Sequence, residues 1–161
     1  MQLLKYTYRY RRVAKFDTSL RRVKEDYYPM LPCRFRSKIA TTDVLYGLLD
    51  SGSEGISIPK ILSELLALDP KEAEPIGVVG GTARRGVDAV DLIIGSQGRY
   101  TEFKDVEISV TLEEEVGPVI LGRAPIFKHY DITFSDADLK VTLNPHKHKS
   151  KKRKRRTSKR I

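Results

Sequence analysis

An acidic residue at the end of an apolar segment is the first feature of this sequence that suggests chemistry. Two leucines lead directly into Asp50, and Ser51, Gly52 and Ser53 follow. A carboxylate at the end of a buried strand is costly unless it is hydrogen-bonded or paired. Glycine allows a sharp turn and close approach, and the serine hydroxyls can donate hydrogen bonds to the carboxylate. The stretch is consistent with a reactive carboxylate held in position by hydrogen bonds, and it is also consistent with a structural Asp-Ser-Gly turn.

The elements around this stretch are expected to be short strands with two short helices. Pro59 suits a first helical position, and the leucines after it share one face as far as Leu68. A second short helix is expected from Pro125 to Tyr130. Period-two alternation or short apolar runs predict strands over residues 44–49, 87–94, 105–110, 119–121, 132–134 and 139–143, the last two joined as a hairpin. Many short strands with two helices indicate a small all-β barrel or sandwich.

The order of these segments resembles that of the retropepsins, the retroviral-type aspartic proteases, and their cellular relatives. The resemblance covers about residues 31–143, which is most of the chain. Asp50-Ser51-Gly52 matches the Asp-Thr/Ser-Gly of that family. The family's second signature is two apolar residues, a glycine and commonly an arginine, and it is matched by Ile120, Leu121, Gly122 and Arg123. The flap hairpin of the family would correspond to a segment that includes Val79, Gly80, Gly81 and Thr82.

The resemblance implies a closed, retropepsin-like barrel of six or seven strands that forms a homodimer. Each chain of such a protease gives one aspartate, and this chain has one Asp-Thr/Ser-Gly, at Asp50. At 161 residues it is too short for a two-lobed enzyme that carries both aspartates. The implied activity is an aspartic endopeptidase acting on polypeptides, in which the paired Asp50 carboxylates activate a water, with neither metal nor cofactor.

The resemblance also assigns roles around Asp50. Ser51 would hold the two active-site loops together across the dimer axis, and Gly52 would lie close to the substrate backbone. Glu54 is expected to pair with Arg123, whereas the alternative is that Arg123 is only a surface cation. Gly80 and Gly81 would lie near the tip of the flap, and the alternative is an ordinary glycine-rich hairpin.

Charge divides the chain into three parts. Residues 1–40 hold 11 Lys/Arg and 3 acids, residues 41–145 hold 9 Lys/Arg and 18 acids, and residues 146–161 hold 10 Lys/Arg and no acid. We expect a basic extension at 1–30, a protease-like domain at 31–145 and a disordered tail at 146–161. Within the extension, the sequence pattern predicts one strand over residues 3–13 and a short helix over 17–26. An added interface strand is favoured for it over a removable pro-segment or a nucleic-acid arm.

The basic ends leave a second function open. A non-catalytic protein with the retropepsin fold could bind nucleic acid non-specifically through its tail, since lysine and arginine neutralise phosphates. Tyr6, Tyr8 and Tyr10 could stack on bases, although tyrosines at period two more often belong to a core or interface strand.

The remaining composition narrows the protein class. With 40% hydrophobic residues the chain is able to form an ordinary core, so disorder throughout is excluded. Its single cysteine, Cys33, excludes an intrachain disulfide and is expected to be a buried, unreactive thiol. Neither a transmembrane run nor a signal-peptide pattern is found, so we expect a cytoplasmic protein without membrane contact.

Overall fold

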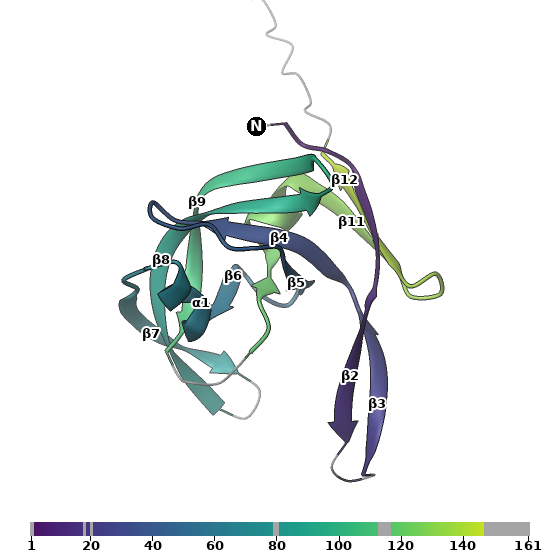
Figure 1. Ribbon diagram of the computed structural model, residues 1–161, viewed down its shortest axis with the longest axis horizontal. Coiled ribbons are helices and arrows are strands. Elements are labelled where there is room, and N and C mark those ends of the chain that lie inside the picture. The colour runs from purple at the N-terminus through teal and green to yellow at the C-terminus, as the bar shows by residue number, and fades with distance from the viewer. Residues whose placement is uncertain (1, 18, 20, 79–80, 113–116, 147–161) are drawn as a thin grey trace, which may run out of the picture.

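The computed structural model describes residues 2–17, 19, 21–78, 81–112 and 117–146. Figure 1 shows a strand-rich body with one long hairpin that leaves it. The elements, in chain order, are β1 (Tyr6–Arg9), β2 (Arg11–Asp17), β3 (Arg22–Tyr28), β4 (Met30–Arg36), β5 (Leu45–Leu49), β6 (Ile56–Pro59), α1 (Lys60–Leu65), β7 (Lys71–Val78), β8 (Gly81–Ser96), β9 (Arg99–Thr111), β10 (Ile120–Leu121), the π-helix η1 (Arg123–Phe127), β11 (Tyr130–Ser135) and β12 (Lys140–Pro145).

Six of these strands form a closed barrel. They are hydrogen-bonded in the order β4-β5-β10-β6-β9-β8, and β4 pairs again with β8 to close the sheet. β7 lies outside this closure as the hairpin partner of β8. Closure leaves no free edge within the barrel itself, which suits short strands that could not form a stable open sheet. The expected small all-β barrel is confirmed.

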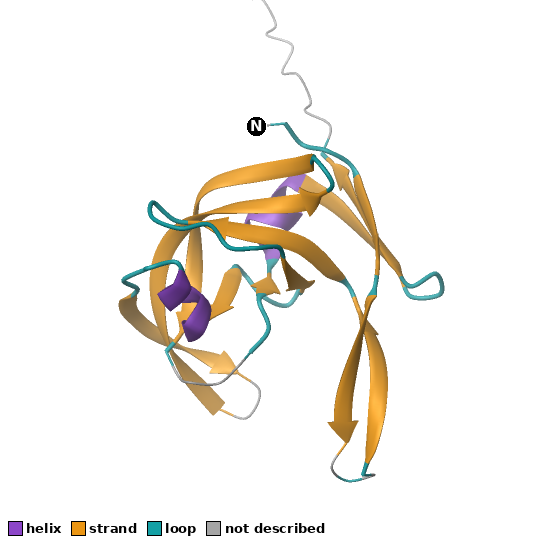
Figure 2. Cartoon of the chain, viewed as in Figure 1, coloured by secondary structure: helices purple, strands orange, loops and turns teal. Residues whose placement is uncertain are grey.

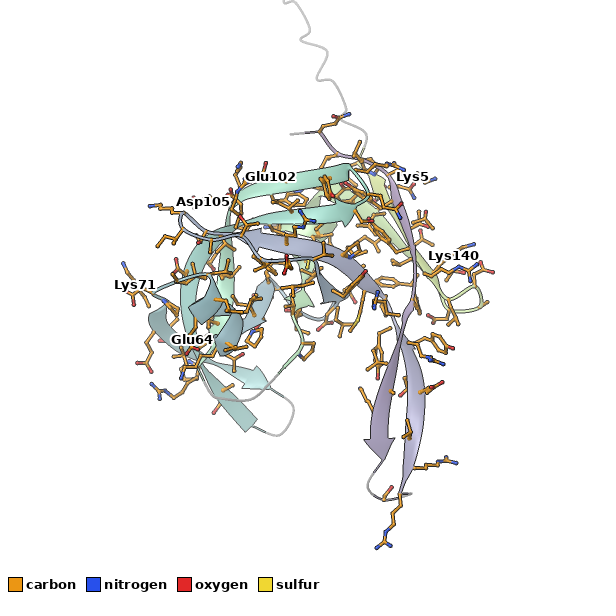
Figure 3. The ribbon with its side chains drawn as sticks, in the orientation of Figure 1. Lys5, Glu64, Lys71, Glu102, Asp105 and Lys140 are labelled. Carbon is orange, nitrogen blue, oxygen red and sulfur yellow. The ribbon has the colours of Figure 1, made fainter. Side chains whose placement is uncertain are left out.

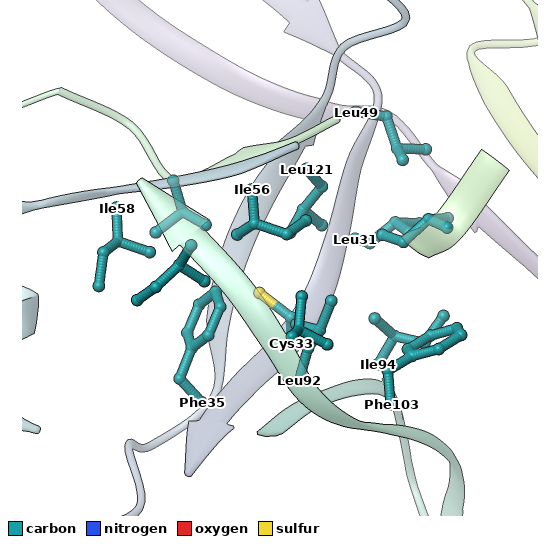
Figure 4. Packing of buried hydrophobic residues seen from close by; sticks show 14 of the residues in the cluster. Leu31, Cys33, Phe35, Leu49, Ile56, Ile58, Leu92, Ile94, Phe103 and Leu121 are labelled. Atoms are coloured by element: carbon teal, nitrogen blue, oxygen red, sulfur yellow. The ribbon is translucent and has the colours of Figure 1, made fainter. Parts of the chain in front are cut away.

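The barrel interior is filled by buried side chains, which alternate with less buried ones in strands such as β6. Leu31 and Phe35 from β4, Leu92 from β8 and Leu121 from β10 are all fully buried. Figure 4 shows these side chains packed together, with Cys33 among them. Burying one such side chain contributes about 1.5–3 kcal/mol, so this cluster is the main source of stability.

The amino-terminal segment forms two strands where a single strand was expected. β1 ends at Arg9 because Tyr10 turns into the core, where it is 9% exposed. The Tyr10 amide donates to Leu139 O at 2.7 Å, and its hydroxyl donates to the Asp136 carboxylate at 2.8 Å. These contacts bind the chain to the β11–β12 hairpin at the point where its direction changes.

β1 adds a strand to that hairpin, which gives the sheet order β1-β12-β11. Tyr6 on β1 is 5% exposed, and its hydroxyl lies 2.9 Å from Thr101 Oγ1 on β9. Thr101 Oγ1 also lies 3.1 Å from the hydroxyl of Tyr130. Burial raises the pKa of Tyr6 to about 12, so this network stays protonated at ordinary pH. The tyrosines of β1 thus serve the core, as tyrosines at this spacing usually do.

The short helix expected over residues 17–26 is wrong. Residues 22–28 form β3, which pairs antiparallel with β2 from Arg11↔Tyr28 to Asp17↔Arg22. Valine and adjacent tyrosines favour a pleated ribbon, and the cross-strand partner supplied by β2 decides the outcome. The two strands form a separate two-stranded sheet.

The other helices and the carboxy-terminal hairpin agree better with expectation. α1 begins directly after Pro59 but ends at Leu65, three residues early. η1 begins at Arg123, two residues before the expected start, and it contains a kink at Ala124 and a cis Ala124–Pro125 bond. β11 and β12 pair as predicted. In the described part of the chain, no helix is long and apolar enough to cross a membrane.

Replacing Thr101 with valine tests the buried hydroxyl network. The substitution keeps the shape and leaves two buried tyrosine hydroxyls without this partner, so we expect a loss of about 1–3 kcal/mol in the free energy of unfolding. Thr7→Val is the matched control, because the Thr7 hydroxyl contacts Thr142 at an exposed position. Urea denaturation of both variants would measure the difference, and equal stability would show that the network contributes nothing.

The reactivity of Cys33 tests its environment. The side chain is fully buried, and desolvation raises the pKa of the thiol to about 12. Because the thiolate is the reactive form, we expect reaction with a disulfide reagent near pH 8 to be at least about a hundred-fold slower in the native protein than in urea. Equal rates in both states would contradict burial in the barrel.

Candidate active site

Asp50 lies directly after β5, at the end of a barrel strand. Its amide donates to Leu121 O at 3.1 Å, which ties the residue to β10. One carboxylate oxygen accepts a hydrogen bond from the Gly52 amide at 2.8 Å. This arrangement is an Asx turn, in which an aspartate binds the backbone two residues further on. It fixes the direction of the carboxylate while Ser51 and Gly52 stay exposed.

The hydrogen bonds around the carboxylate differ from those that the serines suggested. The donor recorded to Asp50 is the backbone of Gly52, and the Ser53 hydroxyl donates to Gly55 O at 3.2 Å instead. An aspartate followed two residues later by glycine carries this Asx-turn signal, so the sequence contained the information. Ser53 therefore stabilises the shape of the loop.

The second motif is held against the Asp50 loop by its backbone. The amides of Gly122, Arg123 and Ala124 donate to the carbonyls of residues 55, 53 and 54 at 3.0, 2.9 and 2.9 Å. With the Asp50 amide bond, four backbone hydrogen bonds join segments about seventy residues apart in the sequence. β10 also lies parallel to β5 and antiparallel to β6. The two motifs that the sequence singled out therefore form one rigid unit.

Gly122 is where the two loops approach most closely. A Cβ atom placed on Gly122 would lie 2.2 Å from Gly55 O and 2.7 Å from Ser53 O. Both neighbours are backbone atoms in the hydrogen-bonded unit, so they are unable to move aside. The glycine of the second motif is thus required by close approach of two backbones.

Glu54 and Arg123 lie near each other, as expected. Arg123 Nη2 is 3.5 Å from Glu54 Oε1, and the two side chains are 54% and 93% exposed. An ion pair this exposed contributes little to the stability of a single chain. The position of this ion pair beside the Asp50 loop matters more for the site than its contribution to stability.

A hairpin stands in the expected flap region. β7 pairs antiparallel with β8 from Lys71↔Val87 to Val78↔Gly81, and Thr82 lies opposite Gly77. Val79 and Gly80, the other two residues assigned to the flap, lie outside the described residues. Figure 2 shows this hairpin extending from the lower side of the barrel.

Two arginines for which the sequence suggested no role make contacts in this hairpin, an exposed ion pair by Arg84 and hydrogen bonds by Arg85. Arg84 Nη2 contacts Glu72 Oε1 at 2.8 Å across the hairpin. Arg85 donates to Glu74 O and to Ser109 Oγ, both at 2.9 Å, and so joins β7 to β9. In the sequence these two arginines are adjacent cations in a predicted hairpin, and that pattern does not identify the residues that they bind.

A groove of about 570 Å³ adjoins the site. Its lining includes Glu54 and Gly55 from the first loop, together with Arg85, Glu107 and His129. His129 is fixed there by a 2.8 Å contact between its Nδ1 and Pro125 O and by the ring of Phe103. The groove thus presents charges of both signs near the loop that carries Asp50.

Comparison with known proteins places the fold. The chain is similar to a retropepsin-like aspartic protease from Rickettsia conorii, with a TM-score of 0.60 and 14% identity over 88% of this chain and 100% of that one. EIAV protease in complex with the inhibitor HBY-793 matches at 0.45 and 19% identity, over 63% of this chain and 86% of that one. The retroviral protease-like domain of Ddi1 from Leishmania major matches at 0.44 and 14%, over 73% and 94%.

No protein-family model matches the sequence, and the search of curated proteins found no match. The retropepsin-like fold is established by the likeness to solved structures and not by a sequence match. Because one fold hosts many functions, the site itself has to carry the functional argument.

Gly122→Ala tests the contact between the two loops. The added methyl group would collide with backbone, so we expect a loss of about 1–3 kcal/mol in the free energy of unfolding. Gly117→Ala is the matched control, because a Cβ there would meet no atom within 4 Å. Thermal unfolding of the two variants would measure the effect, and equal melting temperatures would contradict the close approach.

Proposed function

We propose that the protein is a homodimeric aspartic endopeptidase of the retropepsin type, with Asp50 as the catalytic residue. The observation that carries the proposal is the interlocked pair of loops, 50–55 and 121–124. It holds one oriented carboxylate at the end of a barrel strand and leaves Ser51 and Gly52 exposed beside it. Peptide hydrolysis of this type needs two carboxylates, and a second copy of the chain supplies the other.

The dimer requirement follows from the count of motifs. One chain provides one Asp-Thr/Ser-Gly, so two Asp50 loops have to meet across a two-fold axis. The exposed backbone at Ser51 and Gly52 is the surface available for that meeting. Ser51 would bond the opposite loop, and Gly52 would lie against the backbone of the substrate.

The reaction uses the two carboxylates in different protonation states. Two carboxylates a few ångströms apart do not both ionise cheaply, so they share one proton and titrate as a unit. The ionised Asp50 takes a proton from a bound water, which attacks the scissile carbonyl carbon. The protonated Asp50 gives its proton to the carbonyl oxygen, and a tetrahedral diol forms. The proton held by the first carboxylate then passes to the leaving nitrogen as the C–N bond breaks.

The β7–β8 hairpin would cover the substrate during this reaction. An extended peptide placed between the hairpin and the Asp50 loops adds as a strand and bonds through its main chain. Arg85 bonds to Glu74 O on β7 and to Ser109 on β9, which ties the hairpin to the barrel. The groove lined in part by Glu54 and Gly55 would receive substrate residues remote from the scissile bond.

A binding role on nucleic acid is the competing function. It is favoured by the charge of the chain ends, with 11 Lys/Arg and 3 acids in residues 1–40 and 10 Lys/Arg in residues 146–161. Residues 147–161, which hold all ten cations of the expected disordered tail, lie outside the described residues. Such binding would weaken steeply with salt and would not depend on Asp50.

Cleavage of casein across about pH 3 to 7, the range in which carboxylates titrate, tests the proposal. We expect Asp50→Asn to lower the rate on the order of 10³-fold or more, since its amide can neither accept the proton of water nor donate one to the carbonyl. Asp43→Asn is the matched control, because Asp43 is exposed and lies on the loop before β5.

Two results would contradict this assignment. Equal cleavage by the wild type and by Asp50→Asn would place the activity elsewhere. An inactive wild type whose salt-sensitive binding to single-stranded RNA is unchanged in Asp50→Asn would favour the binding function.

A further inference from the structure

The β2–β3 hairpin, with strands at 11–17 and 22–28, forms an arm that joins no other sheet of the described residues. Its two strands pair only with each other as a separate sheet. Figure 1 shows the arm extending away from the barrel, and Figure 3 shows its side chains standing in open space. A single two-stranded hairpin is marginally stable in water. The arm therefore has the form of an element that another surface completes.

The base of the arm is fixed beside the catalytic loop. Pro29 O, directly after β3, accepts a hydrogen bond from the Leu49 amide at 2.9 Å. The guanidinium carbon of Arg11 lies 3.6 Å from the centroid of the Tyr46 ring on β5. Both contacts are made to the strand that ends at Asp50. The base of the arm is thus bonded to the residue before Asp50, and both of these contacts are made to β5.

One face of the arm carries exposed apolar side chains beside an ion pair between Arg12 and Glu25. The register places Ala14↔Glu25 and Arg12↔Tyr27 on one face, together with Val23. Val23 is 62% exposed and Tyr27 is 47% exposed. On the opposite face the apolar positions are more covered, and Tyr28 accepts a 2.7 Å hydrogen bond from Lys15. Exposed apolar side chains next to charged ones on a projecting ribbon indicate a surface that binds protein.

Charge identifies the partner. Residues 11–28 hold six Lys/Arg and three acids, whereas residues 41–145 of the same chain hold 9 Lys/Arg and 18 acids. A basic arm with an apolar face is complementary to an acidic protein body, and a second copy of this chain provides one. A nucleic acid would satisfy the cations but would leave Ala14 and Val23 in water.

We propose that the arm of each protomer lies along the barrel of the second copy and stabilises the dimer. The inference rests on the homodimer of the proposed function. When two Asp50 loops meet at a two-fold axis, the two arms flank the interface, because each is bonded at its base to the residue before Asp50. Figure 2 shows the arm and the β7–β8 hairpin extending from the same side of the barrel, so the partner would lie between them. By symmetry each barrel receives one arm, which doubles the effect of any change in the arm.

The double variant Val23→Ser/Tyr27→Ser tests the exposed face. Removing two apolar side chains from each arm is expected to raise the dimer dissociation constant at least about tenfold, because buried apolar area drives association. Val13→Ser is the matched control, since Val13 faces Asp26 on the opposite side of the arm. Sedimentation equilibrium of the full chain would give the constants, and near-UV circular dichroism would confirm that each variant is folded.

Arg11→Ala is a second test that leaves the exposed face intact. Loss of its contact with Tyr46 frees the base of the arm, so we expect the dimer to weaken here too. At protein concentrations far above the dissociation constant, both arm variants should cleave casein with the wild-type kcat. Asp50→Asn should show the reverse behaviour, with normal dimerisation and no cleavage. This contrast separates the role of the arm from the proposed catalysis.

Three results would overturn the inference. Dimerisation equal to that of the wild type in both arm variants would show that the arm lies outside the interface. Dimerisation equal to that of the wild type together with lost binding to a single-stranded RNA oligonucleotide would make the arm a nucleic-acid element. A wild type that stays monomeric at all concentrations would remove this inference and the proposed dimer together.

Discussion

The structure depends on the backbone hydrogen bonds that join residues 50–55 to residues 121–124. Each segment alone is a short, polar loop with unsatisfied amides and carbonyls, and each satisfies the other. Because the donors and acceptors are main-chain groups, the geometry is insensitive to most side chains. Such a geometry is compatible with a retropepsin-like fold at 14% identity to the Rickettsia conorii structure.

Closure of the barrel brings these two segments next to each other. β10 is only two residues long, yet it lies between β5 and β6 and brings Gly122 to the carbonyls of the first loop. Leu121 fills the space beside Gly47, where a Cβ would lie 2.5 Å from its Cγ. The core and the site therefore share residues, and a change in Leu121 would affect both.

Three features lie close together in the single chain. They are the Asp50 carboxylate oriented by the Gly52 amide, the exposed turn at Ser51 and Gly52, and the arm whose base is bonded to Leu49. In the proposed homodimer, a two-fold axis at the Asp50 loops would use all three. There the arm would extend the contact between the Asp50 loops to the outer part of the interface.

The sequence by itself determined the local features: the strand ending at Asp50, the second motif at 120–123, the helix after Pro59 and the β11–β12 hairpin. Apolar spacing and turn residues encode these over a few neighbouring positions. Tertiary structure decided the rest. Residues 22–26 form part of the arm because β2 pairs with β3. The Asp50 carboxylate is bound by the Gly52 amide, and Arg85 reaches Ser109 on another strand. Such partners are set by barrel closure and long-range pairing, which no local pattern contains.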